Sequence, residues 1–245
     1  MGKISVIIPA HNEEKYISRC IGSIRESEKL LRQEVEIIVV CNRCTDQTQS
    51  ISQNLGAKVV FNNERCIASV RNEGIFNATG DIIVTIDADN RMTEGTLKEI
   101  YDLLESGKYI GGGAPIRFER YSFPLRLNDW LCRISFALTG LYCGIFWAEK
   151  EKFETIGGFA KIKAMEDVKT AKLLKKYGKT CKKRYTHLKK NYLINSTRKF
   201  DKLGDWLYLK LIFKNFGTFI KAAFGKKDKL DKLLDELFYD YNNEQ

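Results

Sequence analysis

The chain has 245 residues with a formal net charge of +10, 44% hydrophobic residues and three prolines. This composition is typical of a packed globular protein and argues against a disordered chain. The charge is uneven, because residues 1–149 carry 17 basic and 19 acidic residues whereas residues 150–245 carry 24 and 12. The basic part is expected to face an anionic partner such as phosphate groups, nucleic acid or an acidic membrane surface.

Seven cysteines are scattered along the chain, and we expect no signal peptide before the first apolar segment. These features indicate a reducing cytoplasm. Cys41 and Cys44 form a C-x-x-C pair, which is typical of a redox dithiol or of half a zinc site. No second C-x-x-C pair occurs in the sequence, so we favour neither role.

Residues 1–110 alternate between apolar strands and segments of helical periodicity. Strands are expected at residues 3–10, 35–40, 58–61 and 81–89, and helices at residues 12–31, 45–56, 67–80 and 93–107. The strands are almost continuously apolar, which predicts an α/β fold with a mainly parallel sheet and helices on both faces. Sites in such sheets lie at the carboxyl ends of strands. The candidate positions are therefore residues 11–13, 41–42, 62–63 and 87–89.

The second half of the chain has a different pattern. Residues 109–120 resemble another strand, and residues 168–178 predict a lysine-rich helix. The aromatic segment 127–148 has the length of a membrane span but contains Asp129 and Arg133, so we interpret it as buried helix or cleft lining. Residues 203–245 predict a basic, amphipathic helical tail, which would lie on a membrane surface or pack against the rest of the chain.

Asp87 and Asp89 follow a buried strand and are separated only by Ala88. Two carboxylates at a strand end can bind Mg²⁺ or Mn²⁺ and leave positions open for substrate phosphates. The sequence Asp-Ala-Asp-Asn also suits a solvated turn. These residues alone leave both interpretations open.

Several short motifs occur in a fixed order, namely SVIIPAHNEE, VVCNRCTDQT, SVRNEG, DADN, IGGF, MED and STRKF. Over residues 3–203 this series resembles the family 2 glycosyltransferases, which have the GT-A fold. The resemblance rests on the series, because any one motif is too short to be specific. It implies a catalytic domain at residues 1–202, with a nucleotide-binding half at 1–110 and an acceptor half at 111–202, followed by the tail at 203–245.

The resemblance implies a metal-dependent transferase that moves a single sugar from a nucleotide sugar to an acceptor hydroxyl, in most members with inversion. Asp89, with Asp87, would hold Mg²⁺ or Mn²⁺ on the donor diphosphate. Asp167 would be the catalytic base, with Glu166 beside it. The donor-binding residues would be Pro9, Ala10, Asn12, Glu13, Asn42, Arg71, Asp87, Ala88, Asp89, Arg198 and Lys199. The acceptor side would be shaped by Gly157, Gly158 and Phe159.

The chain also departs from the family pattern. Cys41 and Asn42 stand where the family often has two aspartates, so a uridine base is not implied, although an Asn42 amide can pair with a base edge. The Gln-x-x-Arg-Trp signature of processive members is absent from the sequence, which favours transfer of single sugars. Simpler interpretations exist for three motif residues: Asp46 as a helix cap, Arg71 as a surface arginine, and Asp167 as a helix N-terminal acid.

Two other functions compete with a transferase. A nucleotidyltransferase would also use strand-end aspartates, but such enzymes usually have a glycine-rich loop after the first strand, and PAHNEE contains no glycine. A module that binds anionic surfaces would explain the basic half, but no nucleic-acid motif is recognised. We expect a nucleotide-sugar donor, a saccharide or lipid-linked acceptor, no nucleic acid, and membrane contact through residues 203–224. The expected location is the cytoplasm or the inner face of the membrane.

Overall fold

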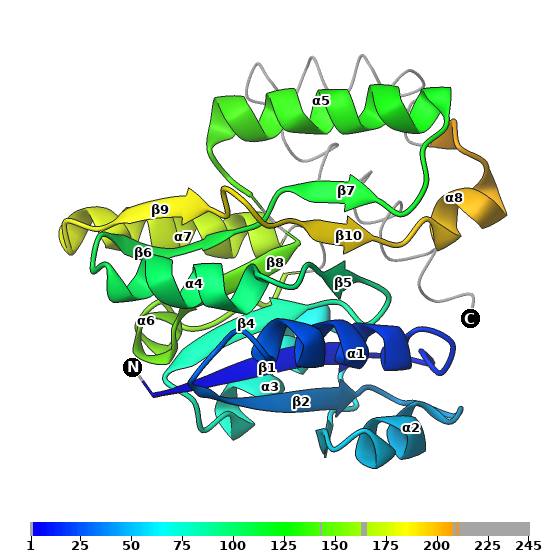
Figure 1. The fold of residues 1–245 in the computed structure, drawn as a ribbon, viewed down its shortest axis with the longest axis horizontal. Helices are drawn as coiled ribbons and strands as arrows, with labels where there is room; N and C mark the ends of the chain where they lie inside the picture. The colour runs from blue at the N-terminus through cyan, green and yellow to red at the C-terminus, as the bar shows by residue number, and fades with distance from the viewer. Residues whose placement is uncertain (1, 143, 163–165, 208–209, 211–245) are drawn as a thin grey trace.

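Strands and helices alternate along most of the chain in the computed structural model, which describes residues 2–142, 144–162, 166–207 and 210 (Figure 1). The first half contains β1 (Lys3–Ala10), α1 (Ile17–Glu28), β2 (Glu34–Cys41), α2 (Thr48–Asn54), β3 (Lys58–Phe61), α3 (Ile67–Asn77), β4 (Ile82–Ile86), β5 (Arg91–Met92) and α4 (Thr96–Glu105). The second half contains β6 (Tyr109–Gly113), β7 (Ile116–Phe118), α5 (Phe123–Thr139), β8 (Ile145–Glu149), α6 (Lys150–Thr155), α7 (Glu166–Thr180), β9 (Arg184–His187), β10 (Leu193–Asn195) and α8 (Arg198–Leu203). Most of the predicted tail lies outside the described residues.

A seven-stranded sheet in the order β3-β2-β1-β4-β8-β6-β9 forms the centre of the described part of the chain. The pairs β1–β2, β1–β4, β2–β3 and β6–β9 are parallel, whereas β8 is antiparallel to both β4 and β6. The prediction of a mainly parallel sheet is therefore confirmed, with β8 as the exception. A second sheet in the order β5-β10-β7 lies above it in Figure 1 and connects to α8.

Helices cover both faces of the large sheet. Alternate residues of β1 point to opposite sides, so Ile8 lies in one core with α1 and α4, whereas Ile7 lies in the other with α3, α6 and α7. Both cores need apolar residues, which explains why the strands are apolar almost throughout. The loops at the carboxyl ends of β1, β2 and β4 therefore follow strands that are packed on both faces.

Two expectations for the middle of the chain are wrong. Residues 109–120 form two strands, β6 and β7, which belong to separate sheets. Pro115 lies between the two strands and has no N–H to continue the pairing of β6. Residues 127–148 are not one buried helix: β8 is a buried strand, whereas α5 exposes Trp130 and Leu138. No helix within the described ranges is long and apolar enough to cross a bilayer.

Gly74 allows α3 to lie close to the sheet. A Cβ atom at this position would lie 2.3 Å from Cγ2 of Ile7 and 3.1 Å from Cγ2 of Val40. We expect Gly74→Ala to lower the free energy of unfolding by about 1–3 kcal/mol, because the added methyl group pushes α3 away from β1. Urea denaturation measures this change.

Gly22→Ala in α1 is the matched control, because a Cβ there meets nothing within 4 Å. This substitution is expected to raise the free energy of unfolding by about 0.5–1 kcal/mol, since alanine restricts the unfolded chain and favours helix. Equal destabilisation of the two variants would contradict close packing of α3 as the cause.

Candidate active site

The loops that follow β1 and β2 are joined to each other at the carboxyl end of the sheet. Asn12 has a φ of 53°, and its side-chain oxygen accepts the N–H of Thr45 at 2.8 Å. The N–H of Glu13 donates to Oγ1 of Thr48 at 2.7 Å. Asp46 accepts the N–H of Thr48 at 3.0 Å, which supports its interpretation as a cap at the start of α2.

Asn42 connects these loops to the segment after β3. Its amide nitrogen donates to the carbonyl oxygens of Asn62 at 2.6 Å and Glu64 at 2.9 Å, and the residue is only 7% exposed. Both N–H groups of the Asn42 amide therefore donate to backbone carbonyls. The predicted contact between Asn42 and a base edge stays a prediction. Pro9 and Ala10, also predicted to bind the donor, are buried at the end of β1.

Residues Asp87 to Asn90 form a turn directly after β4. The N–H of Asn90 donates to the carbonyl oxygen of Asp87 at 3.0 Å. The buried side chain of Asn90 accepts the N–H of Ser196 at 3.1 Å, which fixes the segment that leads into α8. The backbone therefore forms the expected turn and the carboxylates of Asp87 and Asp89 contact guanidinium groups, while metal binding at this motif stays a prediction.

Arg71 of α3 connects this turn to α7. Its Nη2 donates to Oδ1 of Asp87 at 2.8 Å, and its Nη1 donates to Oε1 of Glu166 at 2.5 Å. Burial alone would lower the pKa of the guanidinium group, but Asp87 and Glu166 outweigh it and raise the pKa. The buried Nε atom has no hydrogen-bond partner within the described residues. Arg71 is thus a buried bridge between two halves of the chain, and not a surface arginine.

Phe159 supports Arg71 from the core. The side chain of Asn72 donates to the Phe159 carbonyl at 2.9 Å and accepts the Phe159 N–H at 2.8 Å. The Phe159 ring is 1% exposed, and its centroid lies 5.3 Å from Cζ of Arg71. Gly158 has a φ of 71°, and a Cβ there would lie 2.6 Å from Oδ1 of Asn72. Asn72 was not among the predicted site residues, although its place after Arg71 in SVRNEG was an available signal.

Arg198, at the start of α8, contacts the second aspartate. Its Nη1 and Nη2 donate to the two carboxylate oxygens of Glu13 at 2.7 and 2.8 Å, and its Nε lies 2.9 Å from Oδ2 of Asp89. Its Cζ lies 5.1 Å from the ring centroid of Tyr16. The positive charge of Lys199 also acts on Asp89. Arg198 therefore contacts Asp89 directly, whereas Lys199 acts on Asp89 through its charge.

Negative charge exceeds positive charge in this cluster. Its acidic members are Glu13, Asp87, Asp89 and Glu166, and its guanidinium groups are those of Arg71 and Arg198. With Lys199, whose charge also acts on Asp89, four carboxylates and three cationic groups give a formal balance of −1 when all are ionised. Burial raises the pKa of Glu13 to about 7 although Arg198 opposes this, and burial also raises the pKa values of Asp89 and Glu166.

The donor atoms of Asp87 and Asp89 fit a divalent cation. Carboxylate oxygens are the ligands that Mg²⁺ and Mn²⁺ prefer, and a divalent ion would offset the surplus negative charge. Among the residues that the structure describes, no group of three or more His, Cys, Asp and Glu side chains is arranged to hold a metal. An ion at this turn would therefore complete its coordination with water and with phosphate oxygens of a bound donor.

Asp167 lies in the first turn of α7, directly after Glu166. Its Oδ1 accepts the N–H of Val168 at 2.7 Å, and the residue is half-buried. A negative charge is favourable at this end of a helix. Since Glu166 is held by Arg71, Asp167 is the member of the pair whose carboxylate is not committed to the guanidinium bridge.

The two histidines are held by neighbouring groups. Nδ1 of His11 donates to the carbonyl oxygen of Asn42 at 2.6 Å, which again connects the first two loops. The ring of His187 stacks on Tyr142 with a centroid distance of 3.8 Å, and burial lowers its pKa. The contact of His11 joins two loops, and the contact of His187 packs its ring on a neighbouring side chain.

The C-x-x-C pair lies beside the first loop. The six cysteines within the described ranges are free, and Sγ of Cys44 lies 3.4 Å from the carbonyl oxygen of Ala10. A hydrogen bond from Cys41 lowers the pKa of Cys44 to about 6, whereas burial opposes this change. The same hydrogen bond raises the pKa of Cys41.

Cys44 is expected to react with iodoacetamide at a rate that rises through a pH of about 6, because only the thiolate is the nucleophile. Cys41→Ala removes the hydrogen-bond donor and is expected to move this midpoint toward about 8.5, the value of an ordinary thiol. Peptide mapping by mass spectrometry identifies the alkylated residue, and Cys132, whose pKa is raised by burial, is an internal reference. An unchanged midpoint in the variant would contradict the role of Cys41.

The family model described as "Glycosyl transferase family 2" matches residues 5–160. The chain belongs to this family. The resemblance to family 2 glycosyltransferases that the motif series indicated is therefore confirmed.

Similar proteins are found among curated sequences. Poly(ribitol-phosphate) beta-N-acetylglucosaminyltransferase TarS of Staphylococcus aureus (strain Mu50 / ATCC 700699) is 31% identical over 105 residues, which cover 40% of this chain and 18% of TarS. Dolichyl N-acetyl-alpha-D-glucosaminyl phosphate 3-beta-D-2,3-diacetamido-2,3-dideoxy-beta-D-glucuronosyltransferase of Methanococcus voltae is 33% identical over 165 residues, which cover 62% of this chain and 50% of that protein. The chain thus matches half or less of the length of these two relatives.

Solved structures show the same fold. Residues 1–349 of S. aureus TarS in complex with UDP-GlcNAc have a TM-score of 0.61 at 20% identity, covering 79% of this chain and 58% of that chain. Mannosyltransferase PcManGT from Pyrobaculum calidifontis in complex with GDP-Man and Mn²⁺ has a TM-score of 0.60 at 22% identity, covering 75% of this chain and 54% of that chain. The expected GT-A fold is therefore confirmed.

Proposed function

We propose that the chain transfers a single sugar from a nucleotide-sugar donor to an acceptor hydroxyl, with a divalent metal ion at Asp87 and Asp89. The observation that carries this proposal is the cluster at the end of β4. There, two aspartates of one turn are held by Arg71 and Arg198, and the surplus charge is negative. Membership of glycosyl transferase family 2 supports this function over a nucleotidyltransferase or a surface-binding module.

The donor would lie on the loops after β1 and β2, with its diphosphate toward the turn. Residues Asn12, Glu13 and Asn42 are joined in these loops by hydrogen bonds, which makes a fixed wall for a nucleotide. A metal bound at the aspartates would neutralise negative charge on the departing nucleoside diphosphate. Arg198 and Lys199 add positive charge next to the same position. The similar structures contain UDP-GlcNAc and GDP-Man, so the base stays open.

The acceptor would approach from the N-terminal end of α7. Asp167 would accept the proton of the acceptor hydroxyl as its oxygen attacks the anomeric carbon, which gives inversion. Glu166 is less suited to this task because it is buried and holds Arg71. The exposed Gly157 and its neighbour Gly158 lie before this helix in the chain and would shape the acceptor side.

A saccharide or lipid-linked acceptor is supported by the names of similar proteins. One is named for poly(ribitol-phosphate) and another for a dolichyl-phosphate-linked sugar. The undecaprenyl-phosphate 4-deoxy-4-formamido-L-arabinose transferase of Proteus mirabilis (strain HI4320) is 27% identical over 119 residues, which cover 46% of this chain and 36% of that protein. The proposed membrane contact through residues 203–224 falls largely outside the described residues. The start of the tail is held by Arg120, which pairs with Asp201 and Asp205.

A thermal-shift screen tests the proposal. Nucleoside diphosphates with different bases are added to the full chain with Mn²⁺, with Mg²⁺ or with EDTA. One base is expected to raise the melting temperature in the presence of a divalent ion and much less in EDTA, because a ligand that binds only the folded state stabilises it. Absence of any shift across the panel, or a shift of equal size in EDTA, would contradict a metal-bound diphosphate site.

A further inference from the structure

Helix α5 presents an apolar stripe to the solvent. The stripe consists of Phe123, Trp130, Ile134 and Leu138, which are 73%, 57%, 38% and 82% exposed. At about 100° per residue these four side chains fall within an arc of about 80°, opposite the side that carries the buried Leu125. The stripe extends over about 22 Å of helix. Such a continuous apolar patch indicates an interaction surface.

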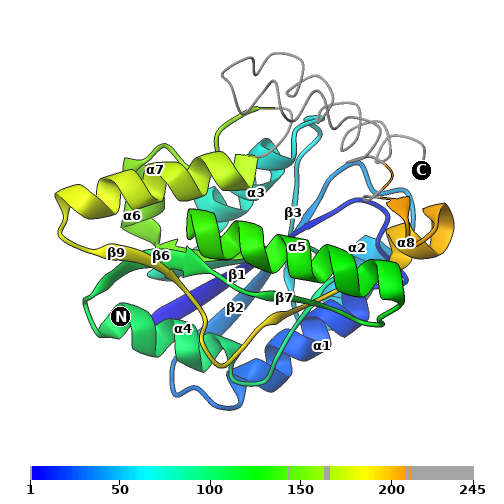
Figure 2. The ribbon, with the colours of Figure 1, turned by 90° about the horizontal axis from the view of Figure 1, so that it is seen from above.

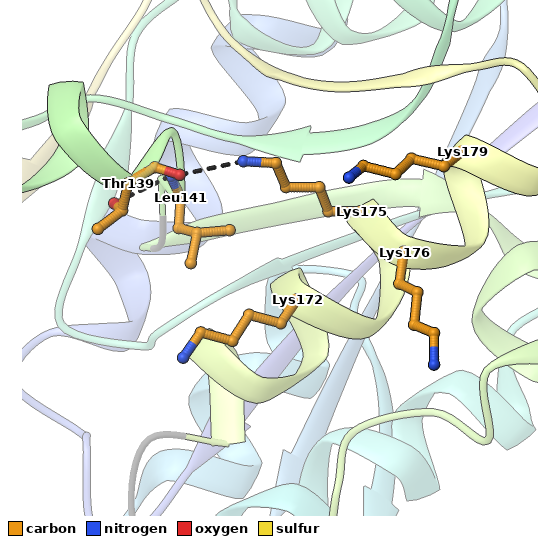
Figure 3. Close-up of a pocket in the computed structure, with 6 residues that line it drawn as sticks. All are labelled: Thr139, Leu141, Lys172, Lys175, Lys176 and Lys179. Carbon is orange, nitrogen blue, oxygen red and sulfur yellow. Dashed lines mark hydrogen bonds between the residues drawn. The ribbon is translucent and has the colours of Figure 1, made fainter. Parts of the chain in front are cut away.

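A row of lysines lies next to the C-terminal end of this stripe. Lys172, Lys175, Lys176 and Lys179 of α7 line a groove of about 420 Å³ together with Thr139 and Leu141 (Figure 3). None of these lysines forms a salt bridge with a carboxylate in the described part of the chain. We call this feature the lysine groove.

The lysine groove adjoins the C-terminal end of α5, where the stripe ends. Nζ of Lys175 donates to the carbonyl oxygen of Thr139 at 3.1 Å, and Thr139 follows Leu138, the last residue of the stripe. Figure 2 looks down on α5 and shows α7 beside its C-terminal end. Apolar side chains and lysine ammonium groups without a carboxylate partner among the described residues therefore lie at the same end of α5.

We propose that this surface seats α5 in the interfacial region of an anionic phospholipid bilayer. The apolar stripe would enter the boundary between headgroups and acyl chains, with the helix parallel to the membrane plane. Tryptophan is favoured at this depth, which suits Trp130. The lysine groove would contact lipid phosphate groups, because juxtamembrane lysines are attracted to anionic leaflets.

Charge complementarity favours a bilayer over the chain's own C-terminal residues as the occupant. Residues 211–245 contain six lysines and six acidic residues, so this segment is rich in lysine but its formal charge is zero, unlike the basic tail expected from the sequence. The surface is basic, since the four groove lysines are joined by Arg126 and Arg133 on α5, of which Arg133 pairs with Asp129. A polyanionic partner matches this surface better than a neutral segment does.

This inference goes beyond the proposed function and does not depend on it, because membrane binding is measured without any donor or acceptor. The surface is nonetheless connected to the candidate site. Helix α7 begins with Glu166 and Asp167 and carries the groove lysines farther along. A bilayer at this surface would therefore bring a membrane-bound substrate to the acceptor side.

Vesicle co-sedimentation of the full chain tests the proposal. Vesicles of phosphatidylcholine alone are compared with vesicles that also contain phosphatidylglycerol, at low and at high salt. We expect binding only to the anionic vesicles, weakened by salt. Two variants, Trp130→Ser/Leu138→Ser and Lys172→Gln/Lys176→Gln/Lys179→Gln, are each expected to weaken binding by about ten-fold or more.

Two control variants carry substitutions of the same kind elsewhere, each with one substitution fewer than the variant it matches. Phe76→Ser removes a side chain of α3 that is 82% exposed, and Lys98→Gln/Lys108→Gln removes charges at α4 and the turn that follows it. Both should bind vesicles as the unchanged chain does. The proposal is overturned if the unchanged chain does not bind anionic vesicles, or if the stripe and groove variants bind as well as the controls, as they would if residues 211–245 alone contacted the membrane.

A second measurement leaves the stripe and the lysine groove unchanged, so it does not depend on whether their variants fold. In a Trp206→Phe chain the remaining tryptophans are Trp130 and the fully buried Trp147. Brominated acyl chains in anionic vesicles are expected to quench the Trp130 fluorescence. Bound protein without quenching would overturn insertion of the stripe.

Discussion

Asp89→Asn is expected to lower the kcat/KM for donor turnover by about 10²–10³-fold, the effect of removing one group that stabilises developing charge. Asparagine keeps an oxygen for Nε of Arg198 but loses the negative charge that a divalent ion requires. The Mn²⁺ concentration needed for half-maximal activity should rise in parallel. Steady-state kinetics at several Mn²⁺ concentrations measure both changes.

The free energy of unfolding of Asp89→Asn should not fall together with its activity. Burial raises the pKa of Asp89, so above that pKa the ionised form opposes folding when no metal is present. Removing the charge should therefore leave the free energy of unfolding unchanged or slightly higher at neutral pH. Asp81→Asn, directly before the same strand, is the matched control and should keep its activity. Equal activity losses in the two variants would contradict a specific role for Asp89.

Asp167→Asn is expected to lower kcat by about 10²–10⁴-fold, the range for loss of a general base. The hydrogen bond that its carboxylate accepts within the described residues comes from the first turn of its own helix, so the free energy of unfolding should fall by less than about 1 kcal/mol. Steady-state kinetics and urea denaturation of the same preparation separate these two effects.

Glu166→Gln should have a different profile, because this buried side chain holds Arg71. Burial raises the pKa of Glu166 as it does that of Asp89, so loss of its charge should leave the free energy of unfolding unchanged or slightly higher at neutral pH, and kcat should fall by less than in Asp167→Asn. Glu151→Gln, another acid in the first turn of a helix, serves as the exposed control. If Glu166→Gln removed activity without any loss of stability while Asp167→Asn stayed active, the roles of the two residues would have to be exchanged.

The sequence predicted the positions of the site better than its contacts. The apolar run of β4 marks where the strand ends, so Asp87 and Asp89 could be placed at the edge of the sheet from a local pattern. The pairs Arg71–Glu166 and Arg198–Glu13 could not be predicted, since they join segments far apart in the chain. Such contacts depend on topology, including the antiparallel insertion of β8 between β4 and β6.

Helix α5 shows a second limit of sequence patterns. Its aromatic and aliphatic residues were interpreted as buried, because large apolar side chains usually lie in a core. In the structure this helix packs on β7 and buries Leu125 and Asn128, while Trp130 and Leu138 face outward. Composition shows that a segment is apolar, but not which partner covers it.

Donor cleavage is the most direct test of the proposed metal-dependent transfer. A panel of nucleotide sugars is incubated with the full chain in Mn²⁺ or in EDTA, and release of the nucleoside diphosphate is followed by mass spectrometry. We predict that one donor loses its sugar with Mn²⁺, much more slowly in EDTA, and much more slowly with Asp89→Asn. Cleavage at the same rate in EDTA, or by Asp89→Asn as fast as by the unchanged chain, would contradict a metal-bound diphosphate at Asp87 and Asp89.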